Sequence, residues 1–501
     1  MNSFTEKNKH IIISISVYVI LWIITSFYLI HSINADTVSY LSIAKKYYDG
    51  NFNDALNACW GPLLSWLVIP SFFLKIEPHI FSRILFGLLS VILFLVIDKF
   101  FIKLELQQRI RCFGVYFFIL PAVYFSFYRL TPDYLLLVLT LIYILISSEK
   151  EFFLKRRLIL YSSFVAMLMF FTKSYGMVFF IVFQTILLFF HIFENRKNYK
   201  TIIFNYALSI IVFALLITPW IIMISNKYNA FTISTSGTIN VRIVNPELNF
   251  RHPTIESGFA KPSDNSAVSA HDDPDISMYP EWNPLSNLNY IIGIIFKHLI
   301  KFLVFTFLFS PIIIPFNLLL KKRMDKRYWI ILLAALIYGL GYTPVYVENR
   351  YIWPSMVLLT ISGLYIINLL SEKILNNNFK FYTFFILTII SFLPFIFYGF
   401  NQQLITTSAY NQAHLISKEF NIKGNIASTN HWGHSLALSY FLNSKFYGTE
   451  KLSLNNPLLL SKSKNFNIDY IFDYSPDTIE TNGLKFIGKV DSISIYQVIN
   501  E

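Results

Sequence analysis

The sequence predicts an α-helical, multi-pass membrane protein with a small soluble α/β domain at its C-terminus. Of its 501 residues, 55% are hydrophobic and only 14% are charged, and the mean hydropathy is +0.52. Apolar runs of helix-spanning length recur along the chain, and they lack the alternation of a transmembrane β-strand. The bilayer interior favours helices because each backbone polar group must then find its partner within the segment. This composition excludes an ordinary soluble protein.

Eleven apolar runs have a length suited to a membrane span. The first is too long for a secretory signal peptide and lacks a small-residue cleavage site, so we expect it to remain as a span. We place the spans at 11–30, 82–97, 112–128, 132–147, 158–172, 175–193, 201–224, 302–320, 328–344, 351–370 and 381–399. We see no internal repeat.

The distribution of charge predicts the orientation. The net charge of +12 comes mainly from Lys and Arg in short connections, which is typical of cytoplasmic loops and not of a nucleic-acid-binding surface. Every second connection is basic, namely 99–111, 150–157, 196–200, 321–327 and 373–380. The N-terminus is therefore expected in the cytoplasm and the C-terminus outside. The composition, rich in Lys, Asn, Ile and Phe, favours a bacterial inner membrane.

Two domains follow from this topology. Residues 1–400 form the transmembrane domain with external loops at 31–81 and 225–287, and residues 401–501 form an external, periplasmic α/β domain. We expect strands near 425–428 and 469–473, a helix near 432–442 and a closing hairpin that ends at 492–498. In the first loop, apolar residues at helical spacing suit a helix in the membrane interface. The long 225–287 loop is of a kind that often acts as a lid.

Short motifs place charged residues at the predicted outer ends of the spans. They read ADTVSYLSIAKKYYDGNF at 35–52, RLTPDYLLLVLT at 129–140, FTKSYG at 171–176, TPWIIMISNKYNAFTISTSG at 218–237 and ENRYIWPSMVLL at 348–359. In this order, they resemble the integral-membrane glycosyltransferases of the GT-C class, in particular the protein mannosyltransferase and lipid A aminoarabinose transferase branch. The resemblance implies a GT-C-like helical domain. It also implies inverting transfer of a sugar from a polyprenyl-phosphate donor on the outer face of the membrane.

The resemblance casts Asp36 as the general base for the acceptor, or as the group that orients the acceptor. A carboxylate at this place is either a catalytic base or the N-cap of a helix. Many relatives carry a second acid directly after the first, and here Thr37 occupies that place. The other acid is then Asp133, although Pro132-Asp133 also has the form of an ordinary helix start.

Two cations are candidates for binding the donor phosphate, Lys173 in FTKSYG and Arg350 in ENRY. Arg binds phosphate with a planar fork and Lys as a point charge, and both would stabilise the charge that develops on the leaving phosphate. The alternatives are that Lys173 extends to the interface from a short hairpin and that Arg350 forms a structural bridge with Glu348. Lys45 and Lys46 are typical of lipid headgroup contacts.

No metal site is assigned. The segment HDDPD at 271–275 offers oxygen ligands for a divalent metal ion, but acidic loops of this kind are usually solvated. The expected partners are the lipid bilayer, a polyprenyl-phosphate-linked sugar and a glycan, lipid or protein acceptor. Two rival functions are a lipid-linked sugar flippase or transporter, which needs related halves and a charged path, and an O-antigen ligase or polymerase, which needs a late, Arg-rich loop.

Overall fold

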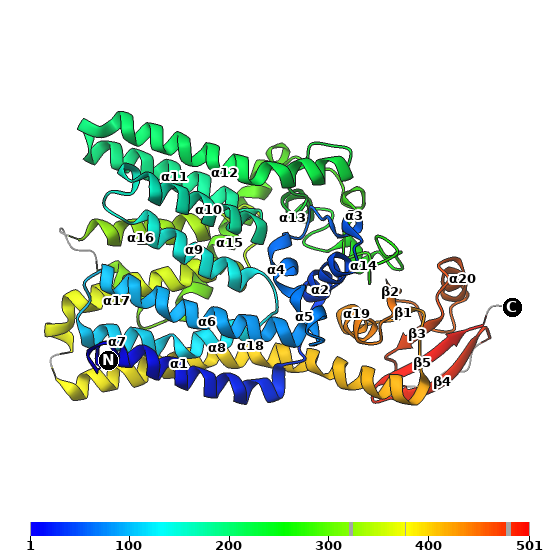
Figure 1. The fold of residues 1–501 in the computed structure, drawn as a ribbon. Helices are drawn as coiled ribbons and strands as arrows, with labels where there is room; N and C mark the ends of the chain where they lie inside the picture. The colour runs from blue at the N-terminus through cyan, green and yellow to red at the C-terminus, as the bar shows by residue number, and fades with distance from the viewer. Residues whose placement is uncertain (1, 320–323, 376, 477–481, 500–501) are drawn as a thin grey trace.

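The computed structural model describes residues 2–319, 324–375, 377–476 and 482–499. A bundle of long helices forms one part of the molecule, and a sheet with its own helices projects from one end of it (Figure 1). We call this end the domain-facing end of the bundle. Shorter helices lie between the bundle and the sheet. Residues 321–323, which belong to the basic connection at 321–327, lie outside the described residues.

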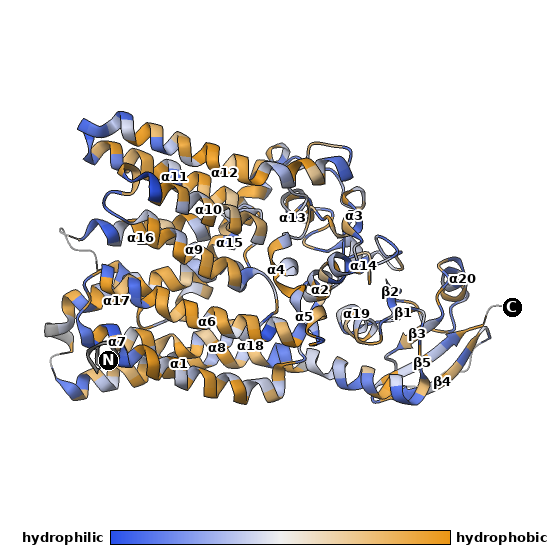
Figure 2. Cartoon of the chain, in the orientation of Figure 1, coloured by the Kyte–Doolittle hydropathy of each residue, from blue (hydrophilic) through white to orange (hydrophobic). Residues whose placement is uncertain are grey.

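Long apolar helices make up the bundle. They are α1 (Asn2–Leu29), α6 (Pro78–Lys103), α7 (Gln108–Phe117), α8 (Ile119–Phe127), α9 (Asp133–Ser147), α10 (Arg156–Thr172), α11 (Tyr175–Glu194), α12 (Tyr199–Lys227), α15 (Leu288–Phe309), α16 (Lys326–Leu340), α17 (Trp353–Ile374) and α18 (Asn378–Phe420). Among the described residues, eight helical segments are long and apolar enough to cross a membrane. Hydrophobic residues cover them along most of their length (Figure 2). The protein is a multi-pass α-helical membrane protein, as the sequence predicts.

The span predicted at 302–320 is wrong. The helix in this region, α15, begins at Leu288, where the side chain of Asn287 caps it, and it ends at Phe309. Pro311 explains the end, because proline disfavours a helical conformation in the residue before it and has no N–H to donate. Lys297 and Lys301, near the middle of α15, lower its hydropathy, which displaced the predicted span towards the C-terminus.

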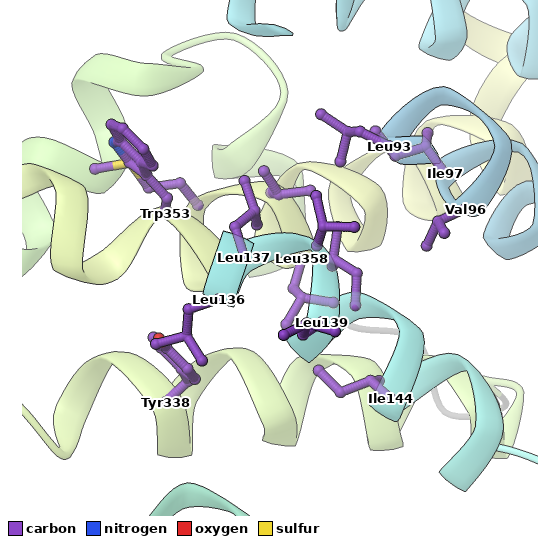
Figure 3. Close-up of a cluster of buried hydrophobic side chains, with 14 of the residues drawn as sticks. Leu93, Val96, Ile97, Leu136, Leu137, Leu139, Ile144, Tyr338, Trp353 and Leu358 are labelled. Atoms are coloured by element: carbon purple, nitrogen blue, oxygen red, sulfur yellow. The ribbon is translucent and has the colours of Figure 1, made fainter. Parts of the chain in front are cut away.

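Helix α9 lies inside the bundle and is apolar on all sides. Its 15 residues extend roughly 22 Å, less than the ~30 Å hydrocarbon core of a bilayer. Leu136, Leu137, Leu139 and Ile144 pack with side chains of α6, α16 and α17 (Figure 3). A helix of this kind is stable when protein surrounds it. The packing holds the first residue of α9, Asp133, at a fixed point within the bundle.

The segment after α1 forms a helix, α2 (Ala35–Tyr48), but neighbouring elements bury most of it, whereas an interfacial helix exposes one face to lipid. Val38, Leu41 and Ala44 are at most 1% exposed, whereas Lys45 and Tyr48 near the end of the helix are exposed. Helix α2 packs against α4 (Pro62–Val68) and against α19 of the C-terminal domain. Two short helices, α3 (Phe52–Ala55) and α5 (Pro70–Phe73), complete this region.

The C-terminal part contains a five-stranded sheet with the order β2-β1-β3-β5-β4. Its elements are β1 (Asn425–Ser428), α19 (Trp432–Phe441), β2 (Lys445–Thr449), α20 (Pro457–Asn465), β3 (Tyr470–Asp473), β4 (Leu484–Val490) and β5 (Ile493–Val498). β1 runs parallel to β2 and β3, and β5 runs antiparallel to β3 and β4. Parallel neighbours need crossover connections, which α19 and α20 provide. The predicted strands, helix and hairpin are confirmed, whereas β2 and α20 were not expected.

The long loop at 225–287 covers the edge of this sheet. It contains the short helices α13 (Ser236–Ile243) and α14 (Pro253–Glu256). The backbone N–H of Ala260 donates to the carbonyl of Tyr447 (2.8 Å), and that of Phe446 donates to the carbonyl of Val268 (2.7 Å). The loop therefore satisfies backbone groups of β2 that an edge strand would leave open. It connects the sheet to the domain-facing end of the bundle.

Candidate active site

Asp36 lies in the first turn of α2 with its carboxylate free of capping. The N-cap is Asn34, whose side-chain oxygen accepts a hydrogen bond from the backbone N–H of Thr37 (3.2 Å). The alternative that Asp36 is the N-cap is therefore wrong. The hydroxyl of Thr37 donates to the carbonyl of Leu130 (2.9 Å), which ties the start of α2 to the turn before α9. Thr37 thus has a structural role where an adjacent acid would stand.

Arg350 links the two candidate acids. It lies in a short 3₁₀ turn, η6 (Asn349–Ile352), directly before α17. Its Nη1 atom is 2.8 Å from Oδ2 of Asp36 and 3.5 Å from Oδ2 of Asp133. Its Nε atom donates to Glu348 at 2.9 Å, so the bridge proposed with Glu348 exists alongside the pairs with the two aspartates. Only 6% of the Arg350 side chain is exposed.

Asp133 and Lys173 form a second ion pair in the same cluster. Lys173 follows the last residue of α10, and its Nζ atom is 2.7 Å from Oδ1 of Asp133. The hydroxyl of Thr131 donates to the other carboxylate oxygen (2.8 Å). The ammonium group also lies 3.6 Å from the ring centroid of Tyr351. Lys173 therefore does not simply extend to the membrane interface, because a buried carboxylate and an aromatic ring hold it.

His271 approaches Asp36 from the 225–287 loop. Its Nε2 atom is 3.6 Å from Oδ1 of Asp36 and makes no hydrogen bond, although it is buried. The backbone carbonyl of His271 accepts hydrogen bonds from Ser39 (3.2 Å) and from the indole of Trp60 (3.1 Å). The ring packs edge-on against Trp432 of α19. Three other segments of the chain, α2, the stretch before α4 and α19, thus determine where this imidazole lies.

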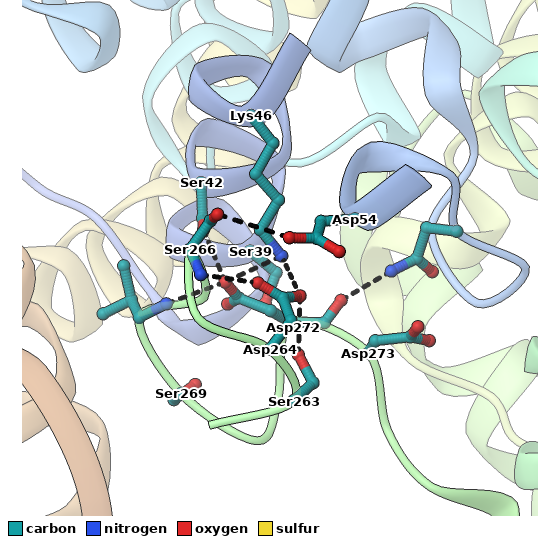
Figure 4. Close-up of polar contacts among 12 residues, drawn as sticks. Ser39, Ser42, Lys46, Asp54, Ser263, Asp264, Ser266, Ser269, Asp272 and Asp273 are labelled. Carbon is teal, nitrogen blue, oxygen red and sulfur yellow. Dashed lines mark hydrogen bonds and ion pairs between the residues drawn. The ribbon is translucent and has the colours of Figure 1, made fainter. Parts of the chain in front are cut away.

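A buried lysine fastens the loop that carries His271. Lys46 of α2 donates to Asp264 (2.6 Å) and lies 4.0 Å from Asp272, whose carboxylate also accepts from Ser42 and from the N–H of Val268 (Figure 4). The prediction that Lys46 contacts lipid headgroups is therefore wrong, since its side chain is 1% exposed. Burial raises the pKa of Asp272 to about 6 despite the attraction of Lys46.

The acidic segment at 271–275 does not form a common ligand set. The carboxylate of Asp272 faces α2, that of Asp273 accepts hydrogen bonds from Lys227 and Tyr228, and that of Asp275 caps a short 3₁₀ turn. These carboxylates have separate partners, so they are not arranged around one metal ion; Asp272 is buried, whereas Asp275 is exposed.

The charges of the cluster balance. The acids Asp36, Asp133 and Glu348 face the cations Arg129, Lys173 and Arg350, and Arg129 completes the set with a 2.8 Å pair to Glu348. Burial raises the pKa of Asp36, but Arg350, His271 and Arg129 outweigh it and hold this pKa well below its usual range. Asp36 is therefore ionised at neutral pH, as a proton acceptor must be.

All four residues that the sequence indicated, Asp36, Asp133, Lys173 and Arg350, meet in this cluster. Sequence reasoning missed Arg129, His271 and Tyr351. Arg129 belongs to the same RLTPDY motif as Asp133, so its motif was a usable signal. No sequence signal indicated His271, because its position depends on the path of a long loop.

The comparisons with known proteins concern the fold. The chain is similar to ArnT from Cupriavidus metallidurans bound to undecaprenyl phosphate, with a TM-score of 0.56 and 12% identity over 98% of each chain. The apo state of that ArnT gives a TM-score of 0.53 and 11% identity, over 96% of this chain and 98% of the other. A mutant of the arabinofuranosyltransferase AftD from Mycobacteria gives a TM-score of 0.50 and 13% identity, over 99% of this chain and 42% of the other.

These neighbours are GT-C glycosyltransferases, and the predicted GT-C fold class is confirmed. No protein-family model matches the sequence, and no curated protein matches it.

Proposed function

We propose that this protein is a glycosyltransferase that moves a sugar from a polyprenyl-phosphate donor to a lipid, glycan or protein acceptor, with inversion at the anomeric carbon. The observation that supports this most strongly is the convergence of an ionised acid, Asp36, with Arg350, Lys173 and Asp133 at one end of the bundle. The fold is also that of a protein solved with undecaprenyl phosphate.

In the proposed reaction, Asp36 accepts the proton of the acceptor hydroxyl or amine. The acceptor atom forms a bond to the anomeric carbon on the face opposite the phosphate. The bond from that carbon to the phosphate oxygen breaks, and the phosphate leaves with the electron pair. Arg350 and Lys173 stabilise the charge that develops on the leaving group. No nucleotide or further reactant is needed.

Asp133 has a different role in this proposal from Asp36. Its side chain is only 3% exposed, and it contacts both cations at once. The carboxylate of Asp36 is 21% exposed, so an acceptor can reach Asp36 more readily than Asp133. We assign Asp133 to holding Lys173 and Arg350 at the spacing that a phosphate group requires.

The proposed reaction takes place on the outer face of a bacterial inner membrane. The basic connections support a cytoplasmic N-terminus. Helix α2, the 225–287 loop and the C-terminal sheet all lie at the domain-facing end, the same end as Asp36 (Figure 1). Single cysteines after residue 410 should react with impermeant reagents only from outside the cell. Labelling from the cytoplasmic side would show that the orientation is the opposite of the one proposed.

The central experiment measures transfer by the full-length protein in nanodiscs. Radiolabelled polyprenyl-phosphate sugars are offered together with candidate acceptors, and the anomeric configuration of the product is determined by NMR. Asp36→Asn should reduce the rate at least ~100-fold, the contribution typical of a general base. The matched control is Asp49→Asn at the other end of α2, where the carboxylate forms an exposed pair with Lys45.

The outcomes separate the alternatives. Transfer by folded Asp36→Asn at the wild-type rate would contradict the assignment of the base. Movement of the lipid-linked sugar across the bilayer without any transfer would favour the flippase. A retained anomeric configuration would contradict direct displacement.

A further inference from the structure

We propose that His31, Glu77 and His79 form a binding site for a transition metal ion, with Zn²⁺ as the best fit. His31 follows α1, Glu77 precedes α6, and His79 is the second residue of α6. Nδ1 of His31, Nε2 of His79 and a carboxylate oxygen of Glu77 all lie within 4.8 Å of one another. None of these residues belongs to the charged cluster around Asp36, so the site goes beyond the proposed transfer reaction.

The distances are close to those of a metal site. Nδ1 of His31 is 2.9 Å from Nε2 of His79, which in turn is 3.3 Å from Oε2 of Glu77. Zinc ligands lie about 2.0–2.2 Å from the ion, so tetrahedral ligand atoms stand roughly 3.3 Å apart. Small side-chain shifts would bring the three atoms around one ion. Two imidazoles and a carboxylate form a ligand set that Zn²⁺ accepts.

The arrangement leaves lone pairs that a single hydrogen does not satisfy. Within the ring pair, one nitrogen donates a hydrogen and the other accepts it. If Nε2 of His79 is the acceptor, its lone pair and the Glu77 carboxylate 3.3 Å away repel each other. If Nε2 of His79 is the donor, its single hydrogen has two acceptors, Nδ1 of His31 and Oε2 of Glu77. A cation at the centre pairs with all three atoms, and His79 is 2% exposed, where unpaired groups are costly.

Neighbouring groups orient the ligands as outer-shell partners do in metal sites. The ring of Tyr410 in α18 stacks on His31, with centroids 3.7 Å apart and planes 5° from parallel. The hydroxyl of Tyr410 donates to Oε1 of Glu77 at 3.2 Å, which leaves Oε2 directed towards His79. Phe441 of α19 packs edge-on against the ring of His79. The candidate ligands are thus held before an ion binds.

The position of the site indicates its role. The ligands lie at the end of α1 and the start of α6, and the residues that orient them come from α18 and α19. A bound ion would join these parts at the junction between bundle and sheet. Glu77 is half exposed, so water can supply the fourth ligand. We assign the ion a structural role at this junction.

The first test measures metal binding by the full-length protein in nanodiscs after treatment with a chelator. The protein is titrated with Zn²⁺ by calorimetry and with Co²⁺ by visible absorption, which reports tetrahedral coordination without any activity assay. We expect roughly one ion per chain. His31→Gln and Glu77→Gln should each weaken binding at least ~10- to 100-fold, the loss that even outer-shell changes produce.

The matched control is His414→Ala, which removes an exposed histidine from the same helix as Tyr410. This variant should bind like the wild type. Equal binding by His31→Gln and the wild type would overturn the proposal, as would the absence of tetrahedral Co²⁺ absorption in the wild type.

The second test measures the role at the junction. Zn²⁺ should raise the Tm of the wild type and of His414→Ala but not that of Glu77→Gln, whose side chain is partly exposed and whose loss leaves the fold intact. An equal rise in Glu77→Gln would mean that the ion binds elsewhere. Asp36→Asn should bind the metal ion like the wild type, because Asp36 is not one of the three ligands. This result would show that metal binding does not depend on the proposed transfer activity.

Discussion

Nη1 of Arg350 lies 2.8 Å from Oδ2 of Asp36, so the proposed base and a proposed phosphate ligand form a direct ion pair. This pair lowers the pKa of Asp36 and keeps its carboxylate ionised. A donor phosphate that binds Arg350 would compete with Asp36 for the same guanidinium. We expect the pKa of Asp36 to rise when the donor is bound, because the phosphate then shares the positive charge of Arg350 that lowers this pKa.

Arg350→Lys should lower kcat about 100-fold while the protein remains folded. Lysine keeps the positive charge, but a single ammonium does not contact Asp36, Asp133 and Glu348 as the guanidinium does. The loss corresponds to ~3 kcal/mol of transition-state stabilisation. The measurement is steady-state transfer in nanodiscs with varied donor.

The control for this change is Arg251→Lys, since Arg251 is exposed and contacts only backbone carbonyls. An Arg350→Lys variant with wild-type kcat would show that the fork geometry plays no part in transfer.

Lys173→Met should destabilise the fold as well as reduce transfer. The change leaves Asp133, which is 3% exposed, without its 2.7 Å partner, and breaking a buried pair costs about 3–5 kcal/mol. The double variant Lys173→Met/Asp133→Asn should recover most of the lost Tm, because no unpaired charge remains, but it should not recover transfer. Thermal unfolding and transfer are measured on the same preparations. Recovery of transfer in the double variant would contradict the role of Lys173 in phosphate binding.

The sequence predicted the helical fold well because a helix that spans a membrane must be apolar, so the hydropathy of the sequence indicates where each helix lies. The error at 302–320 arose where Lys297 and Lys301 lower the hydropathy of a true helix and Pro311 ends it. In the sheet, β2 escaped prediction because the edge strand Lys445–Thr449 is short and contains Gly448. Its partner on the open side is the 225–287 loop, a contact that no local pattern encodes.

The four predicted site residues share one property, which is that each lies at the end of an element whose direction the topology determines. Sidedness alone therefore brought Asp36, Asp133, Lys173 and Arg350 to one region. The position of His271 depends instead on Lys46, Trp60 and Trp432, which come from separate elements. The sequence also did not predict that Asn34 caps α2, since Asp36 is an equally suitable N-cap residue.

His271→Gln should move the acidic limb of the kcat/KM profile to higher pH. His271 is one of the groups that hold the pKa of Asp36 below its usual range, so its removal raises that pKa. At a given acidic pH, a smaller fraction of Asp36 is then ionised, and the rate falls. The neutral plateau should change less than the limb. His252→Gln is the control, because His252 packs against His271 without an ion pair to Asp36. An unchanged limb would mean that His271 acts only in packing.

Lys46→Met should loosen the 225–287 loop and lower transfer without removing any group that touches substrate. The ammonium is buried between Asp264 at 2.6 Å and Asp272 at 4.0 Å, so its loss leaves two carboxylates unpaired. The expected cost is about 3–5 kcal/mol of local stability. Limited proteolysis should cut the loop faster, and the acidic limb of the pH profile should move as in His271→Gln, because the loop carries His271 to Asp36.

The neighbouring Lys45 provides the control for this change. It lies on the same helix with half of its side chain exposed. Its ammonium pairs with Asp49 and lies over the rings of Tyr48 and Phe72, and exposed pairs contribute little to stability. Lys45→Met should therefore match the wild type in proteolysis and in pH profile. If Lys46→Met and Lys45→Met behave alike, the buried pair does not hold the loop, and the position of His271 must depend on its other contacts, such as those with Ser39, Trp60 and Trp432.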